Sequence, residues 1–498
     1  MLFNSFEFIF GFLPLALIGF FVISRRGSRP LAIAYLSLAS MFFYAWWNPW
    51  YLLLLLAEVV FNFGLGRRLA RPDASPRERL LLTIFGIGVM LAVLGYFKYT
   101  YFILDIVNDL GGTSWSAGTI ILPLGISFHS FQQIAYLVDS YKRQAPRYRF
   151  DEYCLFVTFF PQLIAGPIVH HHEIIPQLQS PALVRPRPLN LSLGLAIFSV
   201  GLFKKTVLAD GLAQIASPIF NAAAGGLTLL PSEAWAAAIA YSLQLYFDFS
   251  AYSDMAIGLA LMFNVRLPVN FYSPYRATNI ADFWRRWHMT LSRFLRNYLY
   301  IPLGGNRRGR SRQVVNLMIT MLLGGLWHGA GWTFVIWGGL HGLYLVIHRL
   351  WTLAAPPSEN PWALRARRLA GWLVTMMAVA IAWVFFRAAD LPTAIAMLRS
   401  MGGLQRGAPG AFDDIVSDGL PLIIGTALIA FLMPNVVDIF RRYRPVLPPG
   451  IGLRDLVAPL RALQWRPRPW AGVAVGALAG CGLMAILGWQ SEFLYFQF

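Results

Sequence analysis

Charged residues are scarce in this chain of 498 residues. Only 13% are Asp, Glu, Lys or Arg, about half the charged fraction of an ordinary soluble domain, whereas 57% are hydrophobic. A soluble protein cannot bury that much apolar surface, so the composition predicts a polytopic membrane protein. Lysine is rarer still, with four residues: Lys98, Lys142, Lys204 and Lys205. None of them follows a glycine, which excludes the phosphate-binding loop of nucleotide hydrolases.

Several catalytic and metal-binding signatures are also missing. Cys154 and Cys481 lie far apart in apolar runs and match no metal or redox spacing, so we expect them to pack. Gly125-Ile-Ser-Phe-His129 has histidine where a serine-hydrolase elbow needs its last glycine. His172-Glu-Ile-Ile-Pro176 has proline at the second histidine of a zinc-protease motif. We predict no metal site and interpret His170–His172 as a polar loop, with adventitious metal binding as the alternative.

The formal net charge of +18 at pH 7 is compatible with nucleic acid, a membrane surface or an acidic substrate as partner. The distribution of the basic residues favours membrane lipids and argues against nucleic acid. They fall in short clusters between apolar runs, as the cytoplasmic loops of a membrane protein do. The clusters lie at residues 25–29, 67–71, 142–147, 307–312 and 441–444.

Apolar runs predict an all-α membrane fold with about 11 transmembrane helices plus re-entrant or interfacial helices. The expected runs are 2–23, 31–47, 50–63, 80–97, 119–138, 154–169, 191–207, 235–263, 314–326, 332–350, 370–386, 420–436 and 471–489. The first run is interpreted as an anchor, not a cleaved signal peptide. The positive-inside rule places the N-terminus outside and the basic loops before residue 151 in the cytoplasm; beyond that residue we assign no sides.

His328 lies where an ionisable side chain is unusual. It stands in Leu322-Leu-Gly-Gly-Leu-Trp-His-Gly-Ala-Gly-Trp332, and no Asp, Glu, Lys or Arg occurs from 313 to 348. Ionisable groups at membrane depth are functional candidates, and a neutral imidazole there can act as a general base. A histidine that packs between helices is the alternative. Gly325 and Gly329 permit close approach of a neighbouring helix or a thin substrate.

The segment around His288 predicts an amphipathic helix. Asn279 is a candidate N-cap with Asp282 three residues on, and Asp282 precedes Arg286 by four, the spacing of an ion pair. Helical spacing places Trp284, Trp287, His288 and Leu291 on one face and Arg286, Arg293 and Arg296 on another. Such a helix lies at an interface, with its arginines toward headgroups or a soluble anionic ligand. The alternative is an interfacial anchor whose histidine packs.

Other polar residues have structural interpretations. Asp248 and Asp254 line a cavity or cap a broken helix, and a structural role is preferred. His129 is expected to be hydrogen-bonded inside the bundle, and His341 and His348, seven apart, to pack. Tyr298–Asn306 predicts a helix end and a turn. The arginines that follow it serve topology or dock the phosphates of a cofactor.

Several segments together resemble the membrane-bound O-acyltransferase family. The most specific are Asp282–Asn306, with Asp-Phe-Trp-Arg-Arg-Trp-His at its start, and Gly324-Gly-Leu-Trp-His-Gly329. Further matching segments are residues 1–8, 160–167, 246–254, 270–275 and 495–498. Within the family, the chain is similar to the bacterial branch that acetylates alginate, with the teichoic acid D-alanyl transferases as more distant cousins. The resemblance covers the whole chain and weakens after about residue 390.

The resemblance implies that His328 is the signature intramembrane histidine of the family and His288 its second active-site position. It implies one domain over residues 1–498, with a core at about 120–390 around a central tunnel. His328 would be the base, and His288 with the helix before it would position the acyl donor or polarise its carbonyl. The predicted donor-binding residues are Asn279, Asp282, Arg285, Arg286 and Trp287. In the loop at His170–His172, relatives more often carry basic or aromatic residues, so its role is open.

The resulting hypothesis is O-acetylation of an exopolysaccharide such as alginate. A cytoplasmic thioester, acetyl-CoA, gives up its acetyl group across the bacterial inner membrane to a periplasmic acetyltransferase of the SGNH type, which passes it to the polysaccharide. No tightly bound cofactor is expected. Alternatives are an acyl carrier protein as donor, cellulose or peptidoglycan as acceptor, and a transporter or flippase without chemistry.

Overall fold

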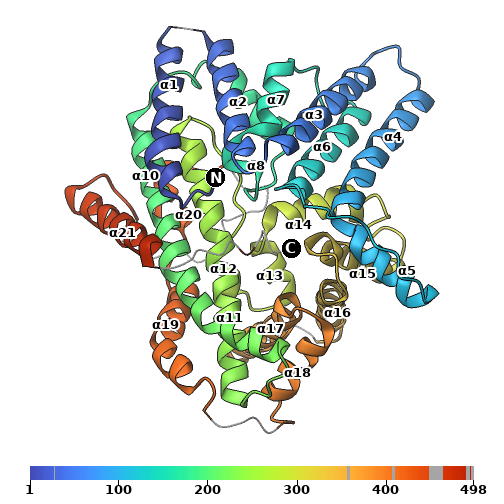
Figure 1. Cartoon of the computed structure of the whole chain (residues 1–498), viewed down its shortest axis with the longest axis vertical. Helices are drawn as coiled ribbons and strands as arrows, with labels where there is room; N and C mark the ends of the chain where they lie inside the picture. Colours follow the sequence, from blue (N-terminus) through green and yellow to red (C-terminus); the bar gives the residue numbers. More distant parts are fainter. Residues whose placement is uncertain (27, 356–358, 406–409, 448–463, 489–493, 495–498) are drawn as a thin grey trace. The chain divides into compact units, whose positions relative to one another are not determined.

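The computed structural model describes residues 1–26, 28–355, 359–405, 410–447, 464–488 and Leu494. Every regular element in these ranges is helical, as the apolar runs predict (Figure 1). The chain forms two compact units. Unit 1 comprises Met1–Leu202, Tyr252–Val269 and Ile439–Ala477, and unit 2 comprises Phe203–Ala251, Asn270–Asp438 and Leu478–Phe498. The chain passes between them within α10 (Pro188–Phe203), α12 (Pro231–Met262), α20 (Val436–Ile439) and α21 (Pro469–Gly488), and also between Val269 and Asn270. Residues 495–498, one of the segments that resemble the O-acyltransferase family, lie outside the described residues.

Unit 1 contains the N-terminal helices. Its elements are η1 (Glu7–Phe12), α1 (Leu13–Arg25), α2 (Arg29–Ala45), α3 (Pro49–Leu69), α4 (Pro76–Leu94), η2 (Gly95–Tyr99), α5 (Thr100–Gly111), α6 (Ile126–Tyr141), α7 (Phe150–Thr158), α8 (Phe160–Leu163), α9 (His171–Gln179), most of α10 (Pro188–Phe203), the end of α12 and η6 (Arg441–Tyr443). Helices α3, α4 and α6 pack on one another, and α2 packs on α1 and α7 (Figure 1).

Local sequence signals set the starts of these helices. Asn48 caps α3 by accepting the backbone N–H of Trp50, and a proline follows it at the first helical position, where its missing N–H costs nothing. Close packing comes from glycine. A Cβ added to Gly194 in α10 would lie 2.5 Å from the carbonyl oxygen of Gly258 in α12, so only glycine permits this helix contact.

Unit 2 contains the two histidines singled out above. Its elements are η3 (Lys204–Ala209), α11 (Asp210–Ala224), the start of α12 (Pro231–Met262), η4 (Pro274–Arg276), α13 (Ile280–Arg286), α14 (Met289–Leu295), η5 (Arg296–Tyr300), α15 (Arg310–His328), α16 (Trp332–Ala354), α17 (Pro361–Arg387), α18 (Leu391–Met401), α19 (Asp413–Leu432), most of α20 (Val436–Ile439) and the end of α21 (Pro469–Gly488). Helix α16 packs on α13, α15 and α17.

Seven helical segments in the described ranges are long and apolar enough to cross a membrane. They are Glu7–Arg25, Pro49–Leu69, Pro76–Gly111, Pro188–Ala224, Pro361–Arg387, Asp413–Leu432 and Pro469–Gly488. The protein is therefore a multi-pass membrane protein. Most other predicted runs also form helices, but α2, with 17 residues, and α6, with 16, are shorter than a typical spanning helix.

Two predicted runs differ from the helices that form. The run 119–138 becomes helical only at Ile126, because Pro123 and Gly125 precede it and Gly125 adopts a left-handed conformation, φ +70°. The run 154–169 is split between α7 and α8 at Phe159, whose ψ of 108° is not helical. Conversely, α12 is one continuous helix of 32 residues, so Asp248 and Asp254 do not cap a broken one.

Candidate active site

His328 is the last residue of α15, and glycines allow that helix to lie close to α16. A Cβ added to Gly325 would lie 2.3 Å from the carbonyl oxygen of Phe334, and one added to Gly338 would lie 2.3 Å from that of Met321. The backbones of α15 and α16 can therefore approach closely only without side chains here. His328 is 6% exposed, and the C-terminal end of a helix carries partial negative charge, which stabilises a cation formed there.

His288 lies between two short helices with an unusual backbone. Its φ of 42° and ψ of 53° are left-handed, and it is the N-cap of α14. The backbone N–H of Met289 donates to the carbonyl of Asn270 at 2.8 Å, which anchors the turn. Such strained residues are uncommon outside functional sites, although histidine tolerates this conformation better than most residues.

This turn makes the prediction of one continuous amphipathic helix wrong. Helix α13 ends at Arg286 and α14 begins at Met289. The 3.6-residue periodicity that places His288 and Leu291 on the face of Trp284 therefore does not continue through His288. The physical reason is tertiary: hydrogen bonds to Asn270 compensate for the helical bonds that the chain gives up at His288.

The side chain of Asn270 sets the tautomer of His288. Its Oδ1 accepts hydrogen bonds from the backbone N–H of Thr290 at 3.5 Å and from the Thr290 hydroxyl at 2.9 Å. A backbone N–H can only donate, so this atom is the amide oxygen. His288 Nδ1 lies 3.0 Å from the same oxygen and must donate to it. Burial lowers the pKa of His288 to about 3, so the ring is neutral at pH 7 and Nε2 carries its lone pair.

The structure brings the two predicted catalytic histidines together. The ring centroids of His288 and His328 are 6.3 Å apart, and His288 is 0% exposed. Aromatic side chains surround the pair. The His328 ring lies 4.9 Å from Trp327, 5.1 Å from Trp337 and 5.3 Å from Phe386, between ring centroids. Two imidazoles lie in apolar surroundings, and one of them is kept neutral by burial with its tautomer set by an amide oxygen; such a site is suited to proton transfer.

The predicted donor-binding residues lie on or beside α13 in three different situations. Asn279 caps the helix, accepting the N–H of Asp282 at 2.8 Å, and Asp282 pairs with Arg286 at 2.9 Å, both as the spacing predicts. Trp287 is buried against Phe283. Arg285 is exposed. The structure thus gives Asn279 and Trp287 structural contacts, and the donor-binding role of all five residues stays a prediction.

Unit 2 also buries a charge cluster that the sequence did not reveal. The ammonium of Lys205 lies 2.6 Å from a carboxylate oxygen of Asp210 and 2.6 Å from one of Asp248. The other oxygen of Asp248 accepts the backbone N–H of Leu494 at 3.3 Å. Asp248 therefore has the structural role preferred for it, as the partner of a lysine.

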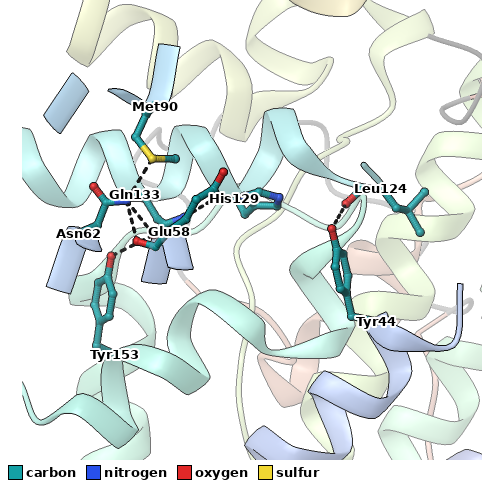
Figure 2. Close-up of polar contacts among 8 residues, drawn as sticks. All are labelled: Tyr44, Glu58, Asn62, Met90, Leu124, His129, Gln133 and Tyr153. Atoms are coloured by element: carbon teal, nitrogen blue, oxygen red, sulfur yellow. Dashed lines mark hydrogen bonds and ion pairs between the residues drawn. The ribbon is translucent and has the colours of Figure 1, made fainter. Parts of the chain in front are cut away.

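A second buried histidine network lies in unit 1 (Figure 2). Nδ1 of His129 lies 2.9 Å from Oε2 of Glu58 in α3. On the other side of Glu58, Gln133 donates to the same oxygen at 3.3 Å, and Asn62 donates to Oε1 of Gln133 at 3.0 Å. His129 thus lies inside the bundle, and its polar contact is with a carboxylate 71 residues earlier, which was not predicted.

The histidine triplet is more ordered than a polar loop. His171 begins α9, and its Nε2 lies 3.1 Å from Oδ2 of Asp139 while its Nδ1 lies 2.8 Å from the Tyr148 hydroxyl. Ligand atoms of Asp139, His171 and His172 lie within 4.8 Å of one another. The contacts of His171 account for both ring nitrogens as a buried structural pair. His341 is buried and His348 is half-buried.

Comparison with known proteins decides the family. The family model of membrane-bound O-acyltransferases matches residues 127–388, a range that contains both histidines. The chain is 45% identical to a peptidoglycan O-acetyltransferase from Helicobacter pylori over 431 residues, covering 81% of this chain and 80% of that protein.

The chain belongs to the membrane-bound O-acyltransferase family. It is also 40% identical to the probable alginate O-acetylase AlgI of Pseudomonas aeruginosa, covering 95% of this chain and 89% of that protein. Identity to the probable alginate O-acetylase AlgI of Pseudomonas putida is 37%, covering 100% of each chain. As a member of the family the protein is an acyltransferase, and these relatives place it with the O-acetyltransferases.

Proposed function

We propose that the protein moves an acetyl group from acetyl-CoA, on the cytoplasmic side of the bacterial inner membrane, to a hydroxyl acceptor on the periplasmic side. The observation that carries this proposal is the buried His288–His328 pair inside the matched family range. The acceptor is a periplasmic acetyltransferase of the SGNH type, which passes the acetyl group to an exopolysaccharide such as alginate.

The chemistry needs one base. The acceptor hydroxyl attacks the thioester carbonyl, and His328 takes the hydroxyl proton. The oxyanion collapses, the carbon–sulfur bond breaks, and the thiolate leaves with the proton from His328, so protons balance without a further reactant. The position of His328 at the C-terminal end of α15 supports this role. The partial negative charge of that helix end stabilises the positive ring that forms during the reaction.

His288 has a role that its tautomer restricts. With Nδ1–H held by Asn270, Nε2 presents a lone pair and can accept a hydrogen bond but not donate one. Of the two roles predicted for His288, this favours positioning over polarisation of the carbonyl. We assign His288 to position the acyl donor. On α13, Arg285 is exposed and can meet a phosphate of the donor.

Peptidoglycan is the second candidate for the final acceptor. The specific observation in its favour is the 45% identity to the peptidoglycan O-acetyltransferase of Helicobacter pylori, against 40% to the Pseudomonas aeruginosa protein. No feature of the buried site separates the two polymers, because a hydroxyl is the reacting group in both.

The test uses purified protein in vesicles with labelled acetyl-CoA and a periplasmic extract of the native host, then alginate or peptidoglycan fragments as final acceptor. We expect release of free thiol, label on one polymer, and loss of both in His328→Gln. If label is transferred only from an acetylated acyl carrier protein, that protein and not acetyl-CoA is the donor. Movement of an unmodified substrate without thiol release would identify a transporter and overturn the proposal.

A further inference from the structure

On α16, two buried N–H donors near His328 have no acceptor among the residues that the structure describes. They are Nε1 of Trp337 and Nε2 of His341, in side chains that are 1% and 0% exposed. An unmade hydrogen bond at a buried donor destabilises a protein by about 1–3 kcal/mol, so each such group in a native fold calls for an explanation.

The proton of His341 is placed by its neighbour. The indole N–H of Trp284 points to Nδ1 of His341 at 3.3 Å. An indole nitrogen can only donate, so Nδ1 accepts and the neutral ring carries its proton on Nε2. The unpartnered atom of His341 is therefore a donor, as is that of Trp337. Neither unpartnered atom can therefore serve as a base, because each one carries a proton.

The two donors lie beside the reacting groups. The rings of Trp337 and His341 are 4.8 Å apart, and the ring of Trp337 is 5.1 Å from that of His328, all between centroids. Both side chains come from α16, one helical turn apart, so they lie on the same face of that helix. A single acceptor atom can be shared by donors arranged in this way.

We propose that Trp337 Nε1–H and His341 Nε2–H bind the carbonyl oxygen of the acyl thioester and stabilise the oxyanion formed on it. This inference rests on the proposed function and supplies N–H donors that His288 cannot supply, since its Nδ1–H is held by Asn270. When the hydroxyl oxygen attacks, the π electrons of the carbonyl move to its oxygen. The two N–H groups stabilise that charge until the carbonyl re-forms and the thiolate leaves.

The experiment compares Trp337→Phe with Trp372→Phe. Both remove one indole N–H and keep an aromatic ring, but Trp372 donates to the backbone carbonyl of Tyr275 at 2.9 Å. We expect Trp337→Phe to lower kcat about 100-fold, as removal of one oxyanion donor does, with little change in KM. Trp372→Phe should keep kcat within about threefold.

Stability and rescue separate catalysis from structure. Both substitutions shrink a ring and lower the Tm through the space that they leave, and Trp372→Phe, which also breaks an existing hydrogen bond, should lower it more than Trp337→Phe. His341→Phe should lower kcat like Trp337→Phe, and His341→Gln, which keeps an N–H donor, should recover part of the rate. Inhibition by free CoA, which has no carbonyl on sulfur, should be the same in all variants.

The outcomes are distinct. If the wild type turns over acetyl-CoA and Trp337→Phe and His341→Phe keep kcat within about threefold, the proposal is overturned and the donors hold water or nothing. A loss of kcat in Trp337→Phe that comes with a larger fall in Tm than in Trp372→Phe would likewise assign the ring to packing. If the wild type cleaves no thioester at all, it is the proposed function that fails, and this assignment fails with it.

Discussion

Each unit of the molecule buries a histidine whose Nδ1 faces an oxygen, and the oxygen differs. His129 in unit 1 faces the carboxylate of Glu58 at 2.9 Å, whereas His288 in unit 2 faces the amide oxygen of Asn270 at 3.0 Å. A carboxylate stabilises a positively charged ring, and an amide oxygen only selects the neutral tautomer. Burial is nearly the same, 1% and 0% exposed, so burial alone does not distinguish His129 from His288, which we propose to act in catalysis.

The neighbours beyond that first oxygen differ as well. Around Glu58 and His129 lie amide and hydroxyl groups that bond mostly to one another (Figure 2). Around His288 and His328 lie aromatic rings. Hydrogen bonds among buried polar side chains hold parts of a fold together, whereas apolar walls with few polar groups leave room for the polarity of a substrate. We therefore expect the chemistry in unit 2.

The largest expected effect comes from the same substitution in the two units. His328→Gln removes the base and should lower acetyl transfer about 1000-fold, within the range for general-base catalysis. His129→Gln keeps an N–H that can donate to Glu58 and should retain at least about a third of the wild-type rate, measured per mole of folded protein in vesicles. Equal losses in both variants would remove the distinction between the units.

Asn270→Ala should have the second largest effect. Without the amide oxygen of Asn270, the proton of His288 is no longer held on Nδ1. We expect kcat to fall about 10- to 100-fold at constant folding yield, as it does when a group that orients a catalytic side chain is lost. The matched variant in unit 1 is Glu58→Ala, which leaves buried donors without an acceptor. It should lower the free energy of unfolding by about 1–3 kcal/mol and leave kcat within about threefold. A loss of kcat in Glu58→Ala with unchanged kcat in Asn270→Ala would show that the network in unit 1 serves the reaction instead.

The third prediction concerns pH. The pKa of His288 is about 3 in the folded protein and that of an unfolded histidine is about 6.5. Below pH 6.5 the unfolded chain binds a proton that the folded chain does not, so this residue lowers stability as pH falls from about 6.5 toward 3, by at most about 1.4 kcal/mol per pH unit. His288→Asn should show a shallower decline of Tm between pH 6.5 and 4, and His129→Gln serves as the control. Parallel curves for wild type and His288→Asn would show that burial of His288 does not disfavour its charge.

Arg285→Gln should have the smallest effect. If this exposed side chain on α13 meets a phosphate of the donor, its loss should raise KM for acetyl-CoA about 3- to 10-fold with kcat unchanged, and the difference should shrink at high salt. Arg296→Gln, also exposed and in η5, is the control. Equal KM values for the two variants would show that Arg285 does not bind the donor and only adds to the positive charge of this region.

Sequence reasoning captured what depends on local pattern. Apolar runs gave most of the helices, the Asn279 cap and the Asp282–Arg286 pair followed from their spacing, and the two family motifs identified His288 and His328 as partners. It did not give the turn at His288, because Trp284, Trp287 and Leu291 keep helical spacing across it. Only contacts with Asn270, 18 residues earlier, break the helix.

The partners of buried polar groups were beyond prediction for a related reason. Glu58 and His129 are 71 residues apart, and Lys205 and Asp248 are 43 apart. Nothing in the sequence near one residue records the side chain opposite it, because helix packing decides which faces meet. The donors Trp337 and His341 show the same limit: their residue types suggest packing, and what singles them out is that the described part of the chain places no acceptor beside them.

The left-handed backbone of His288 also constrains how this site can drift in evolution. At φ 42° a β-branched or bulky side chain is strained, and the residues that tolerate the conformation are glycine, asparagine, aspartate and histidine. Only the last three carry a polar atom that can replace an imidazole nitrogen. Among active descendants of this protein, we therefore expect very few residue types at position 288, because backbone geometry limits them as much as chemistry does.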